Sequence, residues 1–225
     1  MTRYFQKELD KIKKKILTLG ALVEEQVNLA GQAITRTDME LALKIIETDH
    51  DIDDMEVEVE EECLKVLALH QPVAIDLRFL IATIKINNDL ERISDEAVNI
   101  AQRVKAISKK KEIDFAFDYS VMAQKAESML KNSLDSLVNL DIDMSYRVLI
   151  MDDEVDNIKR LAYDKIKAAI KIHPEQVAYL INLLLISRHL ERIADHATNI
   201  AEEVIYLIDG EIVRHDIGKE YLQKG

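Results

Sequence analysis

The chain has 225 residues and a formal net charge of −12 at pH 7, and 48% of its residues are hydrophobic. This length and apolar content suffice for a large buried core without disulfides or a structural metal, and the single cysteine, Cys63, excludes an internal disulfide. The acidic balance disfavours broad electrostatic binding to nucleic acid or to anionic lipid.

The first residues, MTRYFQKELDKIKKK, contain no apolar region of the kind found in secretory leaders. The most apolar stretch, residues 179–186, is too short to cross a bilayer. We therefore expect a cytoplasmic protein that meets a membrane only through its partners.

Apolar residues recur at three- and four-residue spacing, and glycine is absent between residues 32 and 209, so the sequence predicts an all-α protein. Thr37-Asp38 and Asp141 are typical helix openings, and Pro72 and Pro174 suit first helical turns. Six long helices are expected at about 3–36, 38–69, 73–107, 116–139, 142–171 and 174–208.

Short connections make neighbouring helices antiparallel, so each half is predicted to form a three-helix bundle. The predicted parts are a first bundle at 1–107, a connection at 108–117, a second bundle at 118–209 and a tail at 210–225. The basic runs at 11–15 and 109–111 are interpreted as a solvated helix face and a solvated connection.

One phrase occurs twice: LERISDEAVNIA at 90–101 and LERIADHATNIA at 190–201 agree at nine of twelve positions. The similarity continues upstream, where residues 49–55 align with 152–158 and Pro72 with Pro174. The sequence therefore indicates a tandem duplication of two three-helix bundles.

The repeated phrase keeps an acidic pair that packing alone does not require. At 100° per residue, Glu91 and Asp95 share one helix face beside the apolar stripe, as do Glu191 and Asp195. Arg92 lies on another face and is expected to pair with Glu96. The carboxylates of each acidic pair therefore need some other compensating charge.

His196 lies beside Asp195 in sequence but on the other face of its helix, and it is predicted to be a surface residue. Asn99 and Asn199 are open to a second interpretation, as residues whose hydrogen bonds hold packed helices together.

The middle helix of each half carries a second acidic pair, Asp49 with Asp53 and Asp152 with Asp156. The first of these faces continues through Glu56, whereas the second has Lys159 at the equivalent position. Carboxylates from two packed helices can bridge hard cations, so we hypothesise one metal site in each half. Acidic stripes that are merely solvated remain the alternative.

With the acidic middle helices, two stretches carry a family resemblance: HQPVAIDLRFLIATIKINNDLERISDEAVNIA at 70–101 and RHLERIADHATNIAEEV at 188–204. Nearly the whole chain resembles the PhoU family, the regulators of bacterial phosphate uptake. This resemblance implies two similar three-helix bundles and multinuclear metal clusters, with iron in some members.

The ligands implied by the resemblance are Asp49, Asp53, Glu91, Asp95, Asp152, Asp156, Glu191 and Asp195, with Glu202 as a further ligand. Iron is the expected metal, and carboxylate ligands also admit Mn, Mg, Ca or Zn. The implied partners are the ATPase of the phosphate ABC transporter and the phosphate-sensing histidine kinase. A homodimer is also compatible with the sequence, which fixes no oligomeric state.

No catalytic constellation is evident in the sequence, so a non-enzymatic regulator is expected. A purely structural helical adaptor without metal stays an alternative. A carboxylate-bridged di-iron enzyme is disfavoured because such bundles use Glu-x-x-His twice, and this chain has only the pattern at Glu47 to His50.

Overall fold

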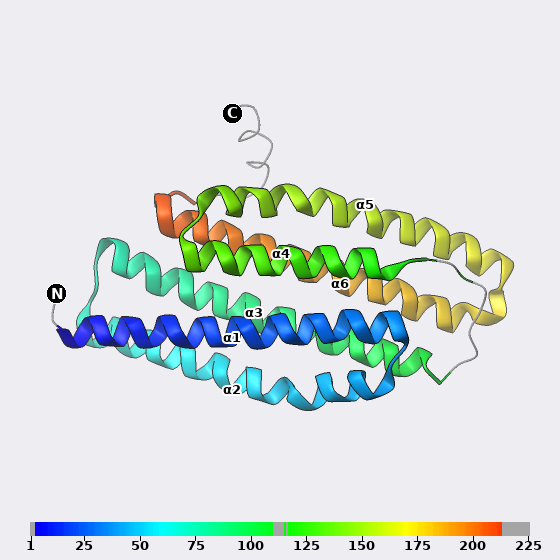
Figure 1. Cartoon of the computed structure of the whole chain (residues 1–225), viewed down its shortest axis with the longest axis horizontal. Helices are drawn as coiled ribbons and strands as arrows, with labels where there is room; N and C mark the ends of the chain where they lie inside the picture. The colour runs from blue at the N-terminus through cyan, green and yellow to red at the C-terminus, as the bar shows by residue number, and fades with distance from the viewer. Residues whose placement is uncertain (1–2, 110–114, 116, 213–225) are drawn as a thin grey trace.

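The computed structural model describes residues 3–109, 115 and 117–212. This part of the chain is built from long helices and contains no strand (Figure 1). The helices are α1 (Arg3–Arg36), α2 (Met39–His70), α3 (Ala74–Ile107), α4 (Tyr119–Asn139), α5 (Ile142–Ile172) and α6 (Val177–Asp209), with a short 3-10 turn, η1 (Pro174–Gln176). The predicted all-α architecture of six long helices is confirmed.

Most helix ends agree with the predicted positions to within a residue, and two starts differ. Helix α4 begins at Tyr119 rather than at 116, because the Asp118 side chain accepts a hydrogen bond from the backbone N–H of Ser120. Pro174 opens a 3-10 turn, and α6 follows at Val177. Residue 116 and most of the predicted connection and tail lie outside the described residues, as do Lys110 and Lys111 of the second basic run.

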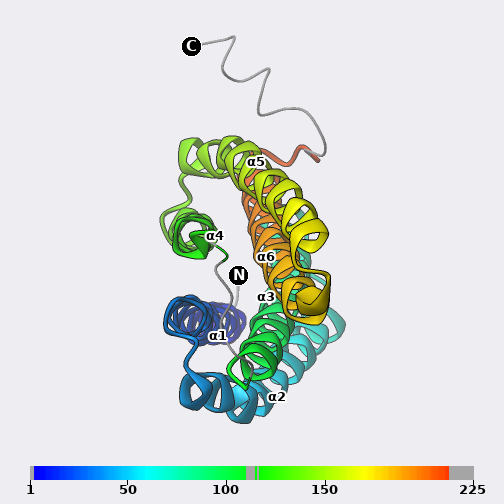
Figure 2. The same cartoon turned by 90° about the vertical axis from the view of Figure 1, so that its right-hand side faces the viewer.

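The two halves pack as copies related by an approximate twofold axis (Figure 2). Within a half, all three helices touch one another, and between halves α3 packs on α6 and α1 on α4. The Asn28 side chain donates to Glu127 while Lys131 lies 3.8 Å from Glu24, so α1 and α4 run antiparallel. This arrangement confirms the predicted tandem duplication of three-helix bundles. None of the described helices has the length and apolar character needed to span a bilayer.

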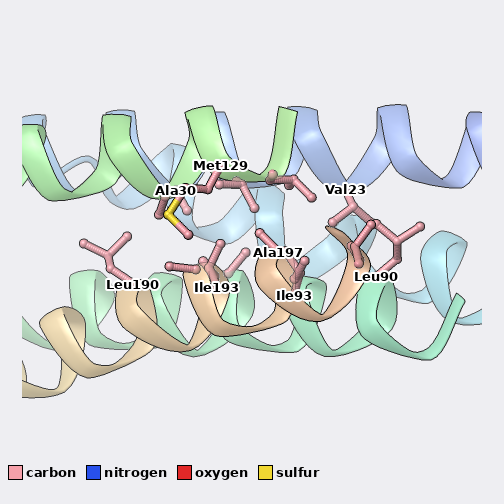
Figure 3. Packing of buried hydrophobic residues seen from close by; sticks show 14 of the residues in the cluster. Val23, Ala30, Leu90, Ile93, Met129, Leu190, Ile193 and Ala197 are labelled. Atoms are coloured by element: carbon pink, nitrogen blue, oxygen red, sulfur yellow. The ribbon is translucent and has the colours of Figure 1, made fainter. Parts of the chain in front are cut away.

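One hydrophobic cluster fills the space between the halves as well as within them. Leu90 and Ile93 of α3 and Leu190 and Ile193 of α6 point together toward α1 and α4, from which Met129 of α4 meets the same cluster (Figure 3). The stripe residues of the repeated phrase are therefore buried in a core that both repeats share.

Polar contacts border the α3–α6 contact, and here two sequence predictions are wrong. Glu96 does not pair with Arg92: its buried side chain forms an ion pair with Nη1 of Arg192 at 2.8 Å, and Nδ1 of His189 lies 2.6 Å away. His196 is not a surface residue, because its side chain is 17% exposed and contacts Asp89 at 2.8 Å. Intra-helix spacing could not reveal partners that lie on the other repeat.

The same contact explains one of the repeated asparagines. The Asn199 side chain donates to the carboxylate of Asp89 at 3.1 Å, which confirms its interpretation as a residue that ties packed helices together. The two imidazole–carboxylate contacts, His196 with Asp89 and His189 with Glu96, occupy equivalent positions under the approximate twofold axis.

We expect Ile93→Ala to destabilise the whole chain by about 2–5 kcal/mol, because it leaves a cavity in a fully buried site of the shared core. Urea unfolding should stay a single transition, and hydrogen exchange should accelerate in α5 as well as in α2. Leu64→Ala, at a side chain that is 52% exposed on α2, should change stability by no more than about 0.5 kcal/mol. Faster exchange confined to the first half would contradict a shared core.

Candidate metal centre

In the first half, α2 and α3 bring their predicted site residues together along the outer line where the two helices pack, which we call the acidic groove. The two helices pack together, and the Asn87 side chain of α3 donates to the Glu56 carbonyl and carboxylate on α2. Two turns away, Ser94 donates to Asp49 at 2.6 Å. This antiparallel alignment puts Asp49 and Asp53 opposite Glu91 and Asp95, so the predicted first-half set is brought together.

The first-half carboxylates repel one another. Burial raises the pKa values of Asp53, Glu91 and Asp95, and neighbouring carboxylates raise them further. The buried Oε2 of Glu91 accepts no hydrogen bond from any described residue. The groove therefore has an excess of negative charge that a bound cation would neutralise.

Arg92 was predicted to point away from this groove, and that prediction is wrong. Its Nε lies 3.4 Å from Glu91 and its Nη1 3.6 Å from Asp95. The guanidinium lowers the pKa values of both carboxyls, but burial and the neighbouring carboxylates outweigh it. With Glu96 held by the other repeat, Arg92 is left to turn toward the acidic groove.

Two further residues belong to this groove although sequence reasoning left them out of the ligand set. Glu56 also has its pKa raised, first by burial and then by Glu60 and Asp53. Gln26 of α1 lies 3.5 Å from Asp49, and its own carbonyl oxygen is 2.6 Å from the Ser94 hydroxyl. The helical position of Glu56 already indicated its role, whereas a contribution from α1 required the packing of three helices.

In the second half, α5 and α6 carry the equivalent set. Burial and the facing carboxylates raise the pKa values of Asp152 and Asp195 to about 6. Asp156 and Glu191 are among the charges that raise the pKa of Asp195. The predicted second-half residues are therefore also close enough to act on one another.

Lys159 distinguishes the second half from the first. Its ammonium contacts Glu191 directly and lies 3.8 Å from Asp156. The lysine thus supplies an internal positive charge at the position where the first half has Glu56. Glu202 is half-buried on α6, two turns beyond Asp195, and its role as a ligand stays a prediction.

Both grooves offer hard oxygen donors, the ligands that Mg²⁺, Ca²⁺ and Mn²⁺ prefer and that carboxylate-bound iron also accepts. As the side chains lie, the described residues contain no group of three or more His, Cys, Asp or Glu poised around one ion. The first groove is the better fit of the two, because the buried Oε2 of Glu91 accepts no hydrogen bond from the described residues and meets Nε of Arg92 only as an ion pair at 3.4 Å.

Comparisons with known proteins agree with the repeat structure. The model of the PhoU domain matches residues 16–104 and again residues 119–204. The chain belongs to the PhoU family. The resemblance noted in the repeated phrase is thereby confirmed, and each family match contains one acidic groove.

Individual PhoU proteins match over most of the chain. A phosphate-specific transport system accessory protein PhoU homolog from Clostridium acetobutylicum is 36% identical over 215 residues, 95% of this chain and 98% of that protein. PhoU from Pseudomonas aeruginosa gives a TM-score of 0.88 at 36% identity, covering 92% of this chain and 100% of that structure. The phosphate transport system regulatory protein PhoU from Streptococcus pneumoniae gives 0.83 at 32% identity, covering 94% and 100%.

The raised pKa values of Asp152 and Asp195 predict a pH-dependent stability. Between the ordinary value of 3.8 and about 6, the folded state binds more protons than the unfolded chain, so stability falls as pH rises through this window. In metal-free buffer, the Asp152→Asn/Asp195→Asn variant should melt a few degrees above the unmodified chain at pH 8, with a smaller difference at pH 4.5. Calorimetry at both pH values measures this difference.

Asp164→Asn, which removes an exposed carboxylate from the same helix, serves as the control and should show no such pH-dependent gain. If the double variant raises the melting temperature equally at the two pH values, the pH dependence of stability does not come from these two carboxyls.

Proposed function

We propose that this chain is a non-enzymatic regulator of phosphate uptake and of phosphate-starvation signalling. It acts on the ATPase of the phosphate ABC transporter and on the phosphate-sensing histidine kinase. The observation that carries the proposal is the match to PhoU proteins over both repeats, since these relatives are named as accessory and regulatory proteins of phosphate transport.

The proposed regulator works in the cytoplasm as a rigid scaffold, as a monomer or a homodimer, and reaches the membrane only through its partners. Its net charge of −12 argues against nucleic acid as a partner and favours a basic surface on a partner protein. The long antiparallel helices hold the two acidic grooves in fixed positions, so that a partner meets a constant arrangement of charge.

We further propose that the carboxylate grooves bind metal ions, with iron as the first expectation and Mn, Mg, Ca or Zn as alternatives. The mutual repulsion of Asp53, Glu91 and Asp95 supports this role. A bound cation would neutralise the facing carboxylates. Ser94 and Gln26 fix Asp49 beforehand, and Arg92 limits the negative charge while the groove is open.

The structure supports one of the two alternative functions, a structural adaptor without metal, more than the other, a di-iron enzyme. A structural adaptor without metal is favoured in the second half by Lys159, which already supplies a cation to Glu191. A di-iron enzyme has no such support. In the one Glu-x-x-His pattern, the His50 ring bonds the Glu47 carbonyl, and both side chains lie on the exposed face of α2.

The regulatory role predicts that the chain represses a phosphate-starvation reporter in a bacterium that lacks its own PhoU protein. In phosphate-rich medium, expression of the chain should lower reporter activity to near the level of the parent strain. Reporter activity with and without the expressed chain is the measurement. A reporter that stays fully active while the folded chain accumulates would overturn the proposed regulatory function.

The metal proposal predicts that Glu91→Gln/Asp95→Asn lowers the metal content of protein purified without added metal or a histidine tag. Adding Mn²⁺ or Fe²⁺ at about a hundred times the dissociation constant should stabilise the unmodified chain by about 2.7 kcal/mol and the variant by much less. Elemental analysis and thermal melting provide the two measurements.

Glu47→Gln/Asp51→Asn is the matched control, since it removes an acidic pair of the same spacing from the exposed face of α2. Equal metal content in all three proteins, or no metal in any of them after anaerobic loading, would contradict the metal proposal. The grooves would then serve only helix packing and partner docking.

A further inference from the structure

A pocket of about 520 Å³ lies between α5 and α6 in the second repeat. Its positive side chains are Lys159, Arg188 and Arg192, and Tyr163 and Leu184 contribute an aromatic and an apolar wall. Glu191 and Asp195 of the acidic groove also line this pocket. Its volume lies in the range of small-molecule sites.

The first repeat provides an internal comparison because its equivalent positions are known from the duplication. Where the second repeat has Lys159 and Tyr163, the first has Glu56 and Glu60. Arg188 similarly corresponds to Asn88. Each of these three differences makes the second surface more positive, whereas the repeated carboxylates are unchanged. The two repeats therefore share their fold and have diverged in the charge of this surface.

The arginines lie where an anion can meet both. Arg188 and Arg192 are one turn apart on α6 and so project from the same face. The exposed Arg188 makes no ion pair within the described residues. Nη1 of Arg192 forms an ion pair with the buried Glu96 at 2.8 Å, and a guanidinium has further N–H groups that can donate to a ligand.

The two carboxylates of the pocket do not cancel this positive region. Lys159 contacts Glu191 directly and partly offsets the burial and the carboxylate repulsion that raise the pKa of Asp195, so part of their charge is already compensated. Arg188 has no such acidic partner among the described residues. An anionic ligand would therefore bind at the arginine end of the pocket, with the lysine ammonium as a third positive group.

We propose that this pocket binds the phosphate group of a small phosphate monoester. Arg188 and Arg192 hold the phosphate oxygens, because planar guanidinium groups match such oxygens with paired hydrogen bonds. Tyr163 and Leu184 contact the organic part, which accounts for a volume larger than phosphate alone requires. The pocket shares Glu191 and Asp195 with the neighbouring carboxylate groove, and the proposed phosphate contacts lie at its arginine end.

Calorimetric titration of metal-stripped, desalted chain with phenyl phosphate tests this site, with inorganic phosphate and phenol as separate arms. One equivalent of phenyl phosphate should bind, and Arg188→Asn should weaken its binding roughly tenfold through loss of a charge-assisted contact. Arg188 suits this test because it is exposed and pairs with no side chain in the part of the chain that the structure describes, whereas Arg192 also holds Glu96. Circular dichroism should show that the variant folds normally.

Asn88→Arg in the first repeat is the matched control, because it adds an arginine one turn before Arg92 without the other differences between the repeats. It should leave the stoichiometry at one. If inorganic phosphate binds as tightly as phenyl phosphate, the pocket is still a phosphate site, and its ligand is free phosphate. Phenol binding as tightly as phenyl phosphate, unchanged affinity in Arg188→Asn, or no binding in any arm would overturn the proposal.

Discussion

The antiparallel packing of α3 on α6 is the constraint from which the other features follow. Its apolar residues form the centre of the core, and the contacts of Glu96 with Arg192 and of His196 with Asp89 border it with polar pairs that join the two repeats. Because a buried carboxylate without a partner is costly, these contacts favour one register of the two helices over its neighbours. That register in turn leaves the acidic faces of both helices directed outward, toward α2 and α5.

Duplication made the two grooves equivalent in backbone, and single residues then made them different in charge. The first half has Glu56 and a carboxylate set that Arg92 compensates only in part, whereas Lys159 supplies a positive charge within the second. Such divergence costs little in stability, because these side chains lie on the outer faces of helices whose inner faces form the core. One scaffold can therefore carry two surfaces of different chemistry at fixed separation.

Much of the fold could be predicted from the sequence, since helix periodicity, capping aspartates and the repeated phrase are local patterns. The acidic faces of α2 and α3 were likewise predictable from 100° spacing, and Asp49 does meet the α3 set. The sequence did not reveal which charged side chains pair with one another. Glu96 pairs with Arg192 of the other repeat, and Arg92 therefore pairs with Glu91 instead of Glu96. The contact between repeats depends on the tertiary register of α3 and α6, which intra-helix spacing does not contain. Gln26 reaches the groove from α1 of the same repeat, so its contact with Asp49 depends on how the three helices of that repeat pack.

Consecutive residues of α3 serve two surfaces, which limits how the acidic groove can act on a partner. Asp95 faces α2, and Glu96, 100° further round the helix, is buried against α6. A cation that rotated or shifted α3 would have to break the Glu96 contacts and disturb the close-packed core behind them. Neutralising the groove is the less costly response, since the carboxylates already lie at the surface of α2 and α3. We therefore expect occupancy of the groove to change the charge that a partner meets while the helices keep their positions.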